Sequence, residues 1–340
     1  MRRLGARERL EQVAVALAGA VPHWASALLR RPRPQDDSLE PDFASLLGLT
    51  ERLGWPPTEG LSVAAARREF RRQQEVLAFG RPRVGAVAAV TVPGGHAPLD
   101  ARLYLPRGAP ARGPLLLYLH GGGWVLGCAA ESDSLCRWIA RQAGVRVLAI
   151  SYRLAPEAPF PAALEDAHSA LRWVNEEAAG LGADPGRVAI GGDSAGGNLA
   201  AAVAREASGS LAAQFLLYPI TDVSREHPSY ATADAPALTA AQMRWFRRHY
   251  LPRESDAMDA RASPLLADDL SRLPPTYVAV AGHDPLRDEG LSYAARLREA
   301  GVLVTLAYHA RLAHGFGDYA GAVPSARAAL REACHWLRAI

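Results

Sequence analysis

A short strand, a turn of small residues and an alanine-rich helix follow one another in the middle of this chain. Residues 188–191 form an apolar, partly β-branched run typical of a buried strand, and residues 199–207 favour a helix. Gly192-x-Ser194-x-Gly196 lies between them. A serine on so sharp a turn needs small neighbours two residues away on either side, because the strand and the helix pass closely. The pattern predicts a nucleophile elbow, in which the helix N-terminus directs unpaired N–H groups at the target of Ser194.

A second glycine-rich turn follows the predicted strand at residues 115–119, in the run His120-Gly-Gly-Gly-Trp124. Glycines let the backbone turn so that its N–H groups point inward without a Cβ in the way. We expect the N–H groups of Gly122, Gly123 and Ala195 to form an oxyanion hole, in which one donor is typically worth about 3–4 kcal/mol. A phosphate-binding turn is a weaker interpretation, because the sequence has neither a G-x-G-x-x-G spacing nor any lysine.

Two acidic residues follow the predicted strand at residues 277–281, and either could orient a histidine. We favour Asp284, which lies nearer the strand end, and interpret Asp288 as an acid at a helix N-terminus.

Two histidines follow the next predicted strand, at residues 303–308. His314 stands in a loop beside a glycine and is the expected general base, whereas His309, at the expected strand end, is interpreted as structural. The order Ser194, Asp284, His314 is that of α/β hydrolases.

Composition excludes several other chemistries. The 340 residues are 49% apolar and carry a net charge of +3, enough for a large core but too little charge for a nucleic-acid protein. The absence of lysine excludes a Schiff base and a Ser–Lys dyad. Three cysteines without a C-x-x-C pair predict no disulfide framework and no metal site, and favour a cytoplasmic protein. No apolar run is long enough for stable membrane insertion.

The chain divides into three parts. Residues 1–80 are expected to form an N-terminal helical extension and part of a cap, with Arg67, Arg68, Arg71 and Arg72 on a solvated helix face and a polar linker near residues 30–37. Residues 81–220 and 271–340 alternate strands with helices after a hairpin (residues 84–92 and 99–105), which predicts a mostly parallel sheet covered on both faces. Residues 221–270, with a helix at 240–250, are expected to be an inserted cap segment.

Five motifs together resemble those of the bacterial hormone-sensitive-lipase-like (family IV) carboxylesterases. They are His120–Trp124, Tyr152–Glu157, Gly192–Asn198, Asp284–Leu286 and His314–Phe316. The resemblance implies an α/β-hydrolase fold with an eight-stranded, mostly parallel sheet and a helical cap. It also implies a serine carboxylesterase without a cofactor, with Ser194 as nucleophile, acting on small esters with short to medium acyl chains. Members of that family are often dimers, so a homodimer is possible.

Several residues and functions remain open at this point. Trp124, Phe316 and Trp245 are candidate pocket residues, with core packing as the alternative. Arg153, Glu157 and Asp166 are interpreted as an ion-pair network beside the site, and Asp193 as a residue that holds the turn. An amide or lactone hydrolase of the arylformamidase type would use the same triad. A non-catalytic ligand-binding protein of this fold is disfavoured by the presence of His314.

Overall fold

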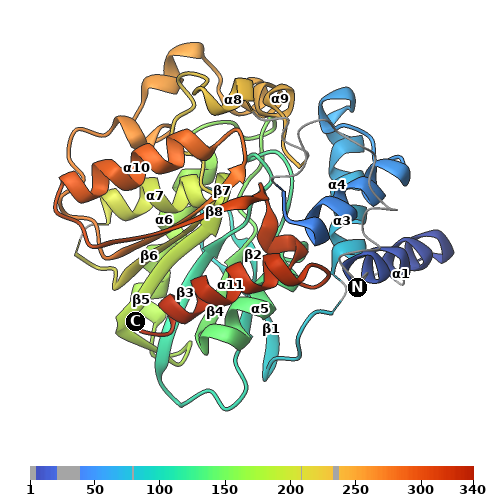
Figure 1. Cartoon of the computed structure of the whole chain (residues 1–340). Helices are drawn as coiled ribbons and strands as arrows, with labels where there is room; N and C mark the ends of the chain where they lie inside the picture. Colours follow the sequence, from blue (N-terminus) through green and yellow to red (C-terminus); the bar gives the residue numbers. More distant parts are fainter. Residues whose placement is uncertain (1–4, 21–38, 79, 208, 233–236) are drawn as a thin grey trace.

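An eight-stranded sheet organises the computed structural model, which describes residues 5–20, 39–78, 80–207, 209–232 and 237–340 (Figure 1). The strand order is β1-β2-β4-β3-β5-β6-β7-β8, with β1 and β2 antiparallel at one edge and the remaining strands parallel to one another. The strands are β1 Ala86–Val92, β2 Leu99–Leu105, β3 Gly113–Leu119, β4 Arg146–Ile150, β5 Ala183–Asp193, β6 Ala213–Leu217, β7 Thr276–His283 and β8 Val304–Ala313. The predicted mostly parallel fold and its leading hairpin are confirmed.

Helices cover both faces of the sheet, as its central strands require. Every residue of β3, β4 and β6 is buried, so these strands have no face open to water. Alternate side chains feed two separate cores: Leu117 packs into one, and Leu116 and Tyr118 into the other. Among the described residues outside 221–270, the α-helices are α1 Ala6–Ala20, α3 Pro41–Arg52, α4 Val63–Leu77, α5 Asp133–Ala143, α6 Ala162–Glu177, α7 Ala195–Glu206, α10 Arg287–Glu299 and α11 Pro324–Leu337.

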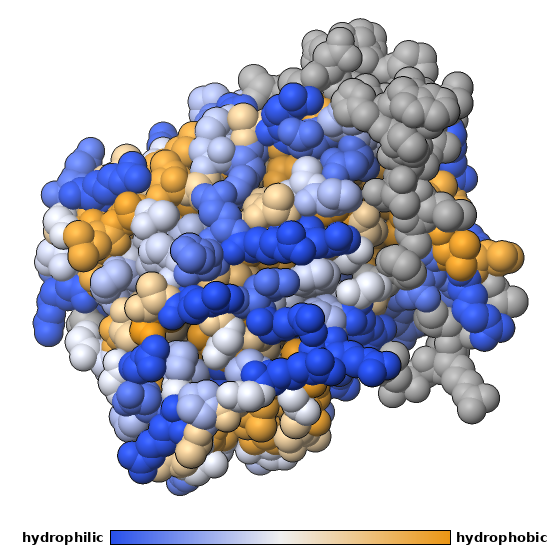
Figure 2. Space-filling model, turned by 60° about the horizontal axis from the view of Figure 1, so that its bottom comes forward, coloured by the Kyte–Doolittle hydropathy of each residue, from blue (hydrophilic) through white to orange (hydrophobic). Residues whose placement is uncertain are grey.

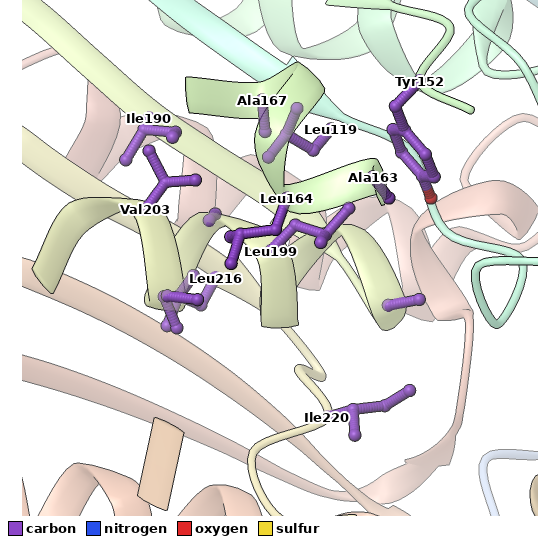
Figure 3. Packing of buried hydrophobic residues seen from close by; sticks show 14 of the residues in the cluster. Leu119, Tyr152, Ala163, Leu164, Ala167, Ile190, Leu199, Val203, Leu216 and Ile220 are labelled. Carbon is purple, nitrogen blue, oxygen red and sulfur yellow. The ribbon is translucent and has the colours of Figure 1, made fainter. Parts of the chain in front are cut away.

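Helix α7 is the central helix of one layer, and its small residues let it pack close to the sheet. Residues 195–204 are all buried, five of them alanine. Figure 3 shows Leu199 and Val203 of α7 beside Leu164 of α6, in a cluster that also contains Ile190 of β5. The helix following Ser194 is therefore held on all sides, which fixes the position of its N-terminus.

Several element boundaries differ from the sequence prediction, and two of them lie beside the site. Helix α7 begins at Ala195 and not near residue 199, because the packing of Gly196 and Gly197 against neighbouring backbone outweighs their low helix propensity. Strand β8 continues to Ala313, so the prediction that His309 ends this strand is wrong: His309 pairs with Ala281 inside the sheet. The strand is longer because its partner β7 continues to His283.

Two segments far apart in the sequence, one before β1 and one between β6 and β7, contribute helices to a layer above the carboxyl ends of the strands (Figure 1). In the segment 221–270 the structure has α8 Ser229–Thr232, α9 Ala240–Tyr250 and the short 310 helices η3 Glu254–Met258 and η4 Pro264–Leu266. Gln242 of α9 donates a hydrogen bond to Thr58 of the 310 helix η2 (Thr58–Gly60) at 3.3 Å, which joins the two segments predicted to form the cap. The linker predicted near residues 30–37 lies outside the described residues.

The prediction of a solvated arginine face on α4 is correct for Arg68 and Arg71, which are exposed, and wrong for Arg67 and Arg72, whose side chains are mostly buried. Arg67 donates to the backbone carbonyls of Val125 and Ala155, each at 2.9 Å, and so ties α4 to the loops beside the strand ends. Arg68 alone is exposed without a described partner. The side-chain partners of the others are Glu157 for Arg67, Glu131 for Arg71, and Glu69 and Glu11 for Arg72. Arg67 and Arg72 turn inward because Glu157 and Glu11, which belong to other elements, meet this face.

On the face shown in Figure 2, hydrophilic residues run between smaller apolar areas. Among the helices that the structure describes, none has the length and apolar character needed to cross a bilayer.

We expect Leu199→Ala to lower the free energy of unfolding by about 2–5 kcal/mol, because it leaves a cavity where α7 meets the sheet. Urea unfolding followed by circular dichroism measures the change. Leu303→Ala is the matched control, since Leu303 is 75% exposed and its loss should change stability by less than about 0.5 kcal/mol. Equal losses in the two variants would contradict this account of the core.

Candidate active site

Ser194 lies on a strained turn between β5 and α7. Its backbone has φ 53° and ψ −118°, a conformation that costs free energy for a residue with a side chain. A Cβ on Gly192 or on Gly196 would overlap the carbonyl oxygen of Leu119, at the end of the neighbouring strand β3. Glycine at both positions therefore lets the turn form against β3, and the turn presents Ser194 at the carboxyl edge of the sheet.

Ser194, His314 and Asp284 form a continuous hydrogen-bonded chain. His314 Nε2 lies 3.0 Å from Ser194 Oγ, and His314 Nδ1 lies 2.7 Å from Asp284 Oδ2. A carboxylate only accepts, so Nδ1 donates to Asp284 and leaves Nε2 to accept the serine proton. The other carboxylate oxygen, Oδ1, accepts the N–H of Leu286 at 2.8 Å, which fixes the orientation of the acid. The arrangement suits proton transfer from Ser194 to His314.

The two candidate acids have different surroundings. Asp288, in the first turn of α10, accepts the N–H of Ser229 at 2.8 Å and pairs with Arg287, so it serves the loop and the helix as expected. Asp284 is the carboxylate that contacts His314.

The other histidines near the strand ends are poorly suited to act as bases. Burial lowers the pKa of His120 to about 4, and its ring is stacked on Tyr152. Burial also lowers the pKa of His309, which packs edge-on against Phe316. Neither hydrogen bonds to Ser194, whereas His314 does.

Three backbone N–H groups near Ser194 are positioned as an oxyanion hole. Gly122 and Gly123 have φ values of 112° and 59°, which glycine adopts readily. Ala195 is the first residue of α7, where N–H groups have no partner within the helix. No backbone acceptor is found for these three groups in the described parts of the chain. They are thus available to an oxygen that binds beside Ser194.

Asp193 holds the loop after β3 in register with the elbow. Its Oδ1 accepts the hydroxyl of Tyr118 at 2.6 Å and the N–H of Gly121 at 2.9 Å. Tyr152 donates to the carbonyl of His120 at 2.6 Å from the other side of this loop. Burial raises the pKa of Asp193, and these hydrogen bonds oppose the shift. The interpretation of Asp193 as a turn residue agrees with these contacts.

A cavity of about 150 Å³ lies between Ser194 and the cap. Its wall includes Phe70 and Leu77 of α4, and Phe246 of α9. Polar side chains complete the wall: Thr58, Gln73, Gln74, Ser132, Gln242 and Asp318. Within the described residues no group of three or more histidine, cysteine or acidic side chains is arranged to hold a metal.

The three aromatic residues proposed from the sequence to line the pocket are instead placed in the core. Trp124 stacks on Tyr250 with ring centroids 4.0 Å apart. Phe316 packs edge-on against Tyr218, and Trp245 packs against His249. The residue after Trp245, Phe246, faces the cavity, because successive helix positions point in different directions.

Comparisons with known proteins agree with this geometry. A family profile described as alpha/beta hydrolase fold matches residues 116–318. The carboxylic ester hydrolase LipN of Mycobacterium tuberculosis is 44% identical over 296 residues, which cover 82% of this chain and 77% of that protein.

The chain belongs to the hormone-sensitive-lipase-like alpha/beta hydrolases. An ethyl acetate hydrolase of Pseudomonas putida is 40% identical over 82% of the chain and 92% of that protein. An ester hydrolase from the metagenome of Lake Arreo, solved with a bipyridine phosphonate derivative, superposes with a TM-score of 0.85. It is 39% identical and covers 88% of this chain and 98% of its own.

In this alpha/beta hydrolase the proposed ion-pair network beside the site is split in two. Arg153 pairs with the buried Asp166 at 2.9 Å, and Asp166 also accepts the N–H of Gly95. Glu157 instead forms an ion pair with Arg67 of α4 and is largely exposed. The cap connection was not predicted, because nothing in the sequence shows which glutamate an arginine almost a hundred residues away will meet.

The alpha/beta hydrolase site also contains residues that sequence reasoning missed. Asp318, on the 310 helix η5 (Phe316–Tyr319), accepts a hydrogen bond from Gln74 of α4 at 3.2 Å. Burial and the nearby Asp193 carboxylate raise the pKa of Asp318 to about 7, against smaller opposing effects of Gln74 and His314. The sequence feature that could have pointed to Asp318 is its position four residues after His314.

We expect Asp318→Asn to gain stability relative to the native protein as pH rises. Its folded pKa of about 7 exceeds the value of about 3.9 in an unfolded chain. Between these values the folded protein binds a proton that the unfolded chain has lost, so the stability contributed by Asp318 falls as pH rises through the folded pKa. Asparagine still accepts from Gln74 but does not titrate. Urea unfolding at a series of pH values between the two limits and above measures the difference.

The exposed Asp268→Asn is the control for this titration. Its stability relative to the native protein should change little with pH. A constant difference for Asp318→Asn as well would contradict the raised pKa.

Proposed function

We propose that this protein is a serine carboxylesterase that works through an acyl-enzyme intermediate. The observation that carries the proposal is the hydrogen-bonded chain from Ser194 through His314 to Asp284, at the N-terminus of α7 and beside the unpaired N–H groups of Gly122 and Gly123. The relatives named as a carboxylic ester hydrolase and an ethyl acetate hydrolase support an ester as substrate.

In the first half-reaction, Ser194 Oγ attacks the ester carbonyl carbon while its proton passes to His314 Nε2, 3.0 Å away. The carbonyl electron pair moves onto oxygen, and the N–H groups of Gly122, Gly123 and Ala195 stabilise the resulting charge. Collapse of this intermediate breaks the bond to the alkoxy group. That group takes the proton from His314 and leaves as the alcohol.

In the second half-reaction, His314 removes a proton from water, and the oxygen of that water attacks the acyl carbon. The tetrahedral intermediate collapses, Ser194 Oγ recovers the proton from His314, and the acid departs. Asp284 keeps the imidazole in the required tautomer and stabilises its cation in both halves.

Substrates are expected to have short to medium acyl chains. A cavity of about 150 Å³ is comparable to one that holds a benzene molecule, so it suits the short end of this range. Phe70 and Phe246 of the cap limit its extent.

We also propose that the enzyme acts in the cytoplasm. All three cysteines, Cys128, Cys136 and Cys334, are free thiols, and two of them are buried, which fits a reducing compartment.

We expect Ser194→Ala to lower kcat/KM on p-nitrophenyl butyrate by several orders of magnitude, because the triad acts as a unit. Asp284→Asn should cost about ten-thousandfold, since an amide favours the wrong imidazole tautomer. Asp288→Asn is the matched control and should keep most of the activity, because Asp288 contacts a loop and not His314. Similar losses in the two asparagine variants would mean that the acid is misassigned. Labelling with a fluorophosphonate checks that Ser194 remains reactive in Asp288→Asn.

We expect Phe70→Ala to shift the acyl-chain optimum toward longer esters, because Phe70 is only partly buried and lines the cavity from α4. The measurement is kcat/KM across a series of p-nitrophenyl esters. Met258→Ala, a change at an exposed side chain outside the cavity wall, is the control. An unchanged optimum in Phe70→Ala would contradict the role of Phe70 in limiting the cavity.

A further inference from the structure

The polar side of the catalytic cavity has no role in the proposed mechanism. Two of its residues already serve the cap: Gln242 bonds to Thr239 and Thr58, and Gln73 donates to Glu69. Asp318 and Gln74 differ from these, because their side chains meet each other across the boundary between η5 and α4. They therefore form the part of the polar wall that joins the cap to the loop carrying His314.

Asp318 is poorly compensated for a carboxylate in such a place. In the part of the chain that the structure describes, Gln74 is the one side chain that hydrogen bonds to it, and no arginine pairs with it. A carboxylate offers about four acceptor positions, so most of them remain available. Asp318 is only partly buried and lines the cavity, so these positions are open to a group that enters it. A hydrogen-bonding group of the substrate is therefore a suitable partner for Asp318.

The pair also has a defined hydrogen-bonding pattern. Asp318 accepts, while the amide nitrogen of Gln74 has two N–H groups and uses one of them on Asp318. A neutral hydroxyl matches both, because it donates to the carboxylate and accepts from the second N–H. An ammonium group cannot accept from Gln74, and a carboxylate would be repelled by Asp318 and Asp193, with no arginine in the described wall to offset the charge.

We propose that Asp318 and Gln74 form a specificity subsite that binds a hydroxyl group of the substrate. The preferred substrates are then esters that carry a neutral hydroxyl a few bonds from the scissile carbonyl, because Ser194 and Asp318 line the same cavity of about 150 Å³. The inference rests on the proposed esterase function and names a substrate class for it. Both residues contact substrate and take no part in bond breaking.

The test compares ethyl esters of butyric, β-hydroxybutyric, β-methoxybutyric and β-aminobutyric acid, with each enantiomer measured separately, and ethylene glycol monobutyrate. Acid release in a pH-stat held above pH 7, where Asp318 is ionised, gives kcat/KM. The native enzyme should prefer the β-hydroxy ester, or the glycol ester if the hydroxyl binds from the alcohol side, by about tenfold or more over its non-donating counterpart. The methoxy ester keeps the oxygen but cannot donate to Asp318, so it isolates this hydrogen bond.

Asp318→Leu and Gln74→Leu should each bring that ratio close to one, whereas Asp318→Asn, which keeps an acceptor, should retain part of it. The ratio of two substrates in one variant cancels any loss that is common to both. Gln73→Leu is the matched control, because its amide bonds to Glu69 and not to Asp318, and its ratio should stay native. Fluorophosphonate labelling of Ser194 shows that each variant is folded. If Asp318→Leu does not fold, Gln74→Leu and Asp318→Asn carry the test.

A ratio near one in the native enzyme, an equal fall of the ratio in Gln73→Leu, or a preference for the amino ester would overturn the subsite while leaving the esterase function intact. Failure to hydrolyse any of the esters would overturn the proposed function, and the subsite with it.

Discussion

The end of β3 and the elbow after β5 lie so close together that no side chain fits between their backbones. The carbonyl oxygen of Leu119 occupies the space that a Cβ on Gly192 or Gly196 would need. One hydrogen-bonded pair, Asp193 with the N–H of Gly121, then sets the loop beside the nucleophile. The strained backbone of Ser194 is held by this contact and by the buried helix α7, whose packing supplies the free energy that the turn costs.

Acidic and basic side chains occupy different places around this contact. The carboxylates Asp193, Asp284 and Asp318 lie near the reacting serine, and each is held by N–H, O–H or imidazole groups and not by an arginine. The arginines instead brace the surroundings, as Arg67 does between the cap and the loops after the strands. The cavity is therefore suited to neutral substrates, and an anion would meet repulsion on entering it.

Much of the site could be predicted from sequence because each part follows a strand directly. Ser194, Asp284 and His314 are each the first residue after β5, β7 and β8, and parallel strands bring their carboxyl ends to one edge. The cap side of the cavity could not be predicted in this way. Trp245 was proposed and Phe246 lines the wall, a difference of one position that depends on the rotation of α9 about its axis. Likewise Gln74 meets Asp318 through the docking of α4, for which no local pattern exists.

The amino-acid sequence was sufficient to establish the order of strands and helices, the elbow and the two candidate partners of Ser194, because these depend on local spacing and on the geometry of a parallel sheet. It was not sufficient to place the side chains that meet across separate elements. Arg67 was expected to face solvent and binds two backbone carbonyls, and Asp318 was not singled out and lies in the cavity wall. Such contacts arise when distant segments pack, since the free energy of burying and pairing a charge depends on neighbours that only the folded chain brings together.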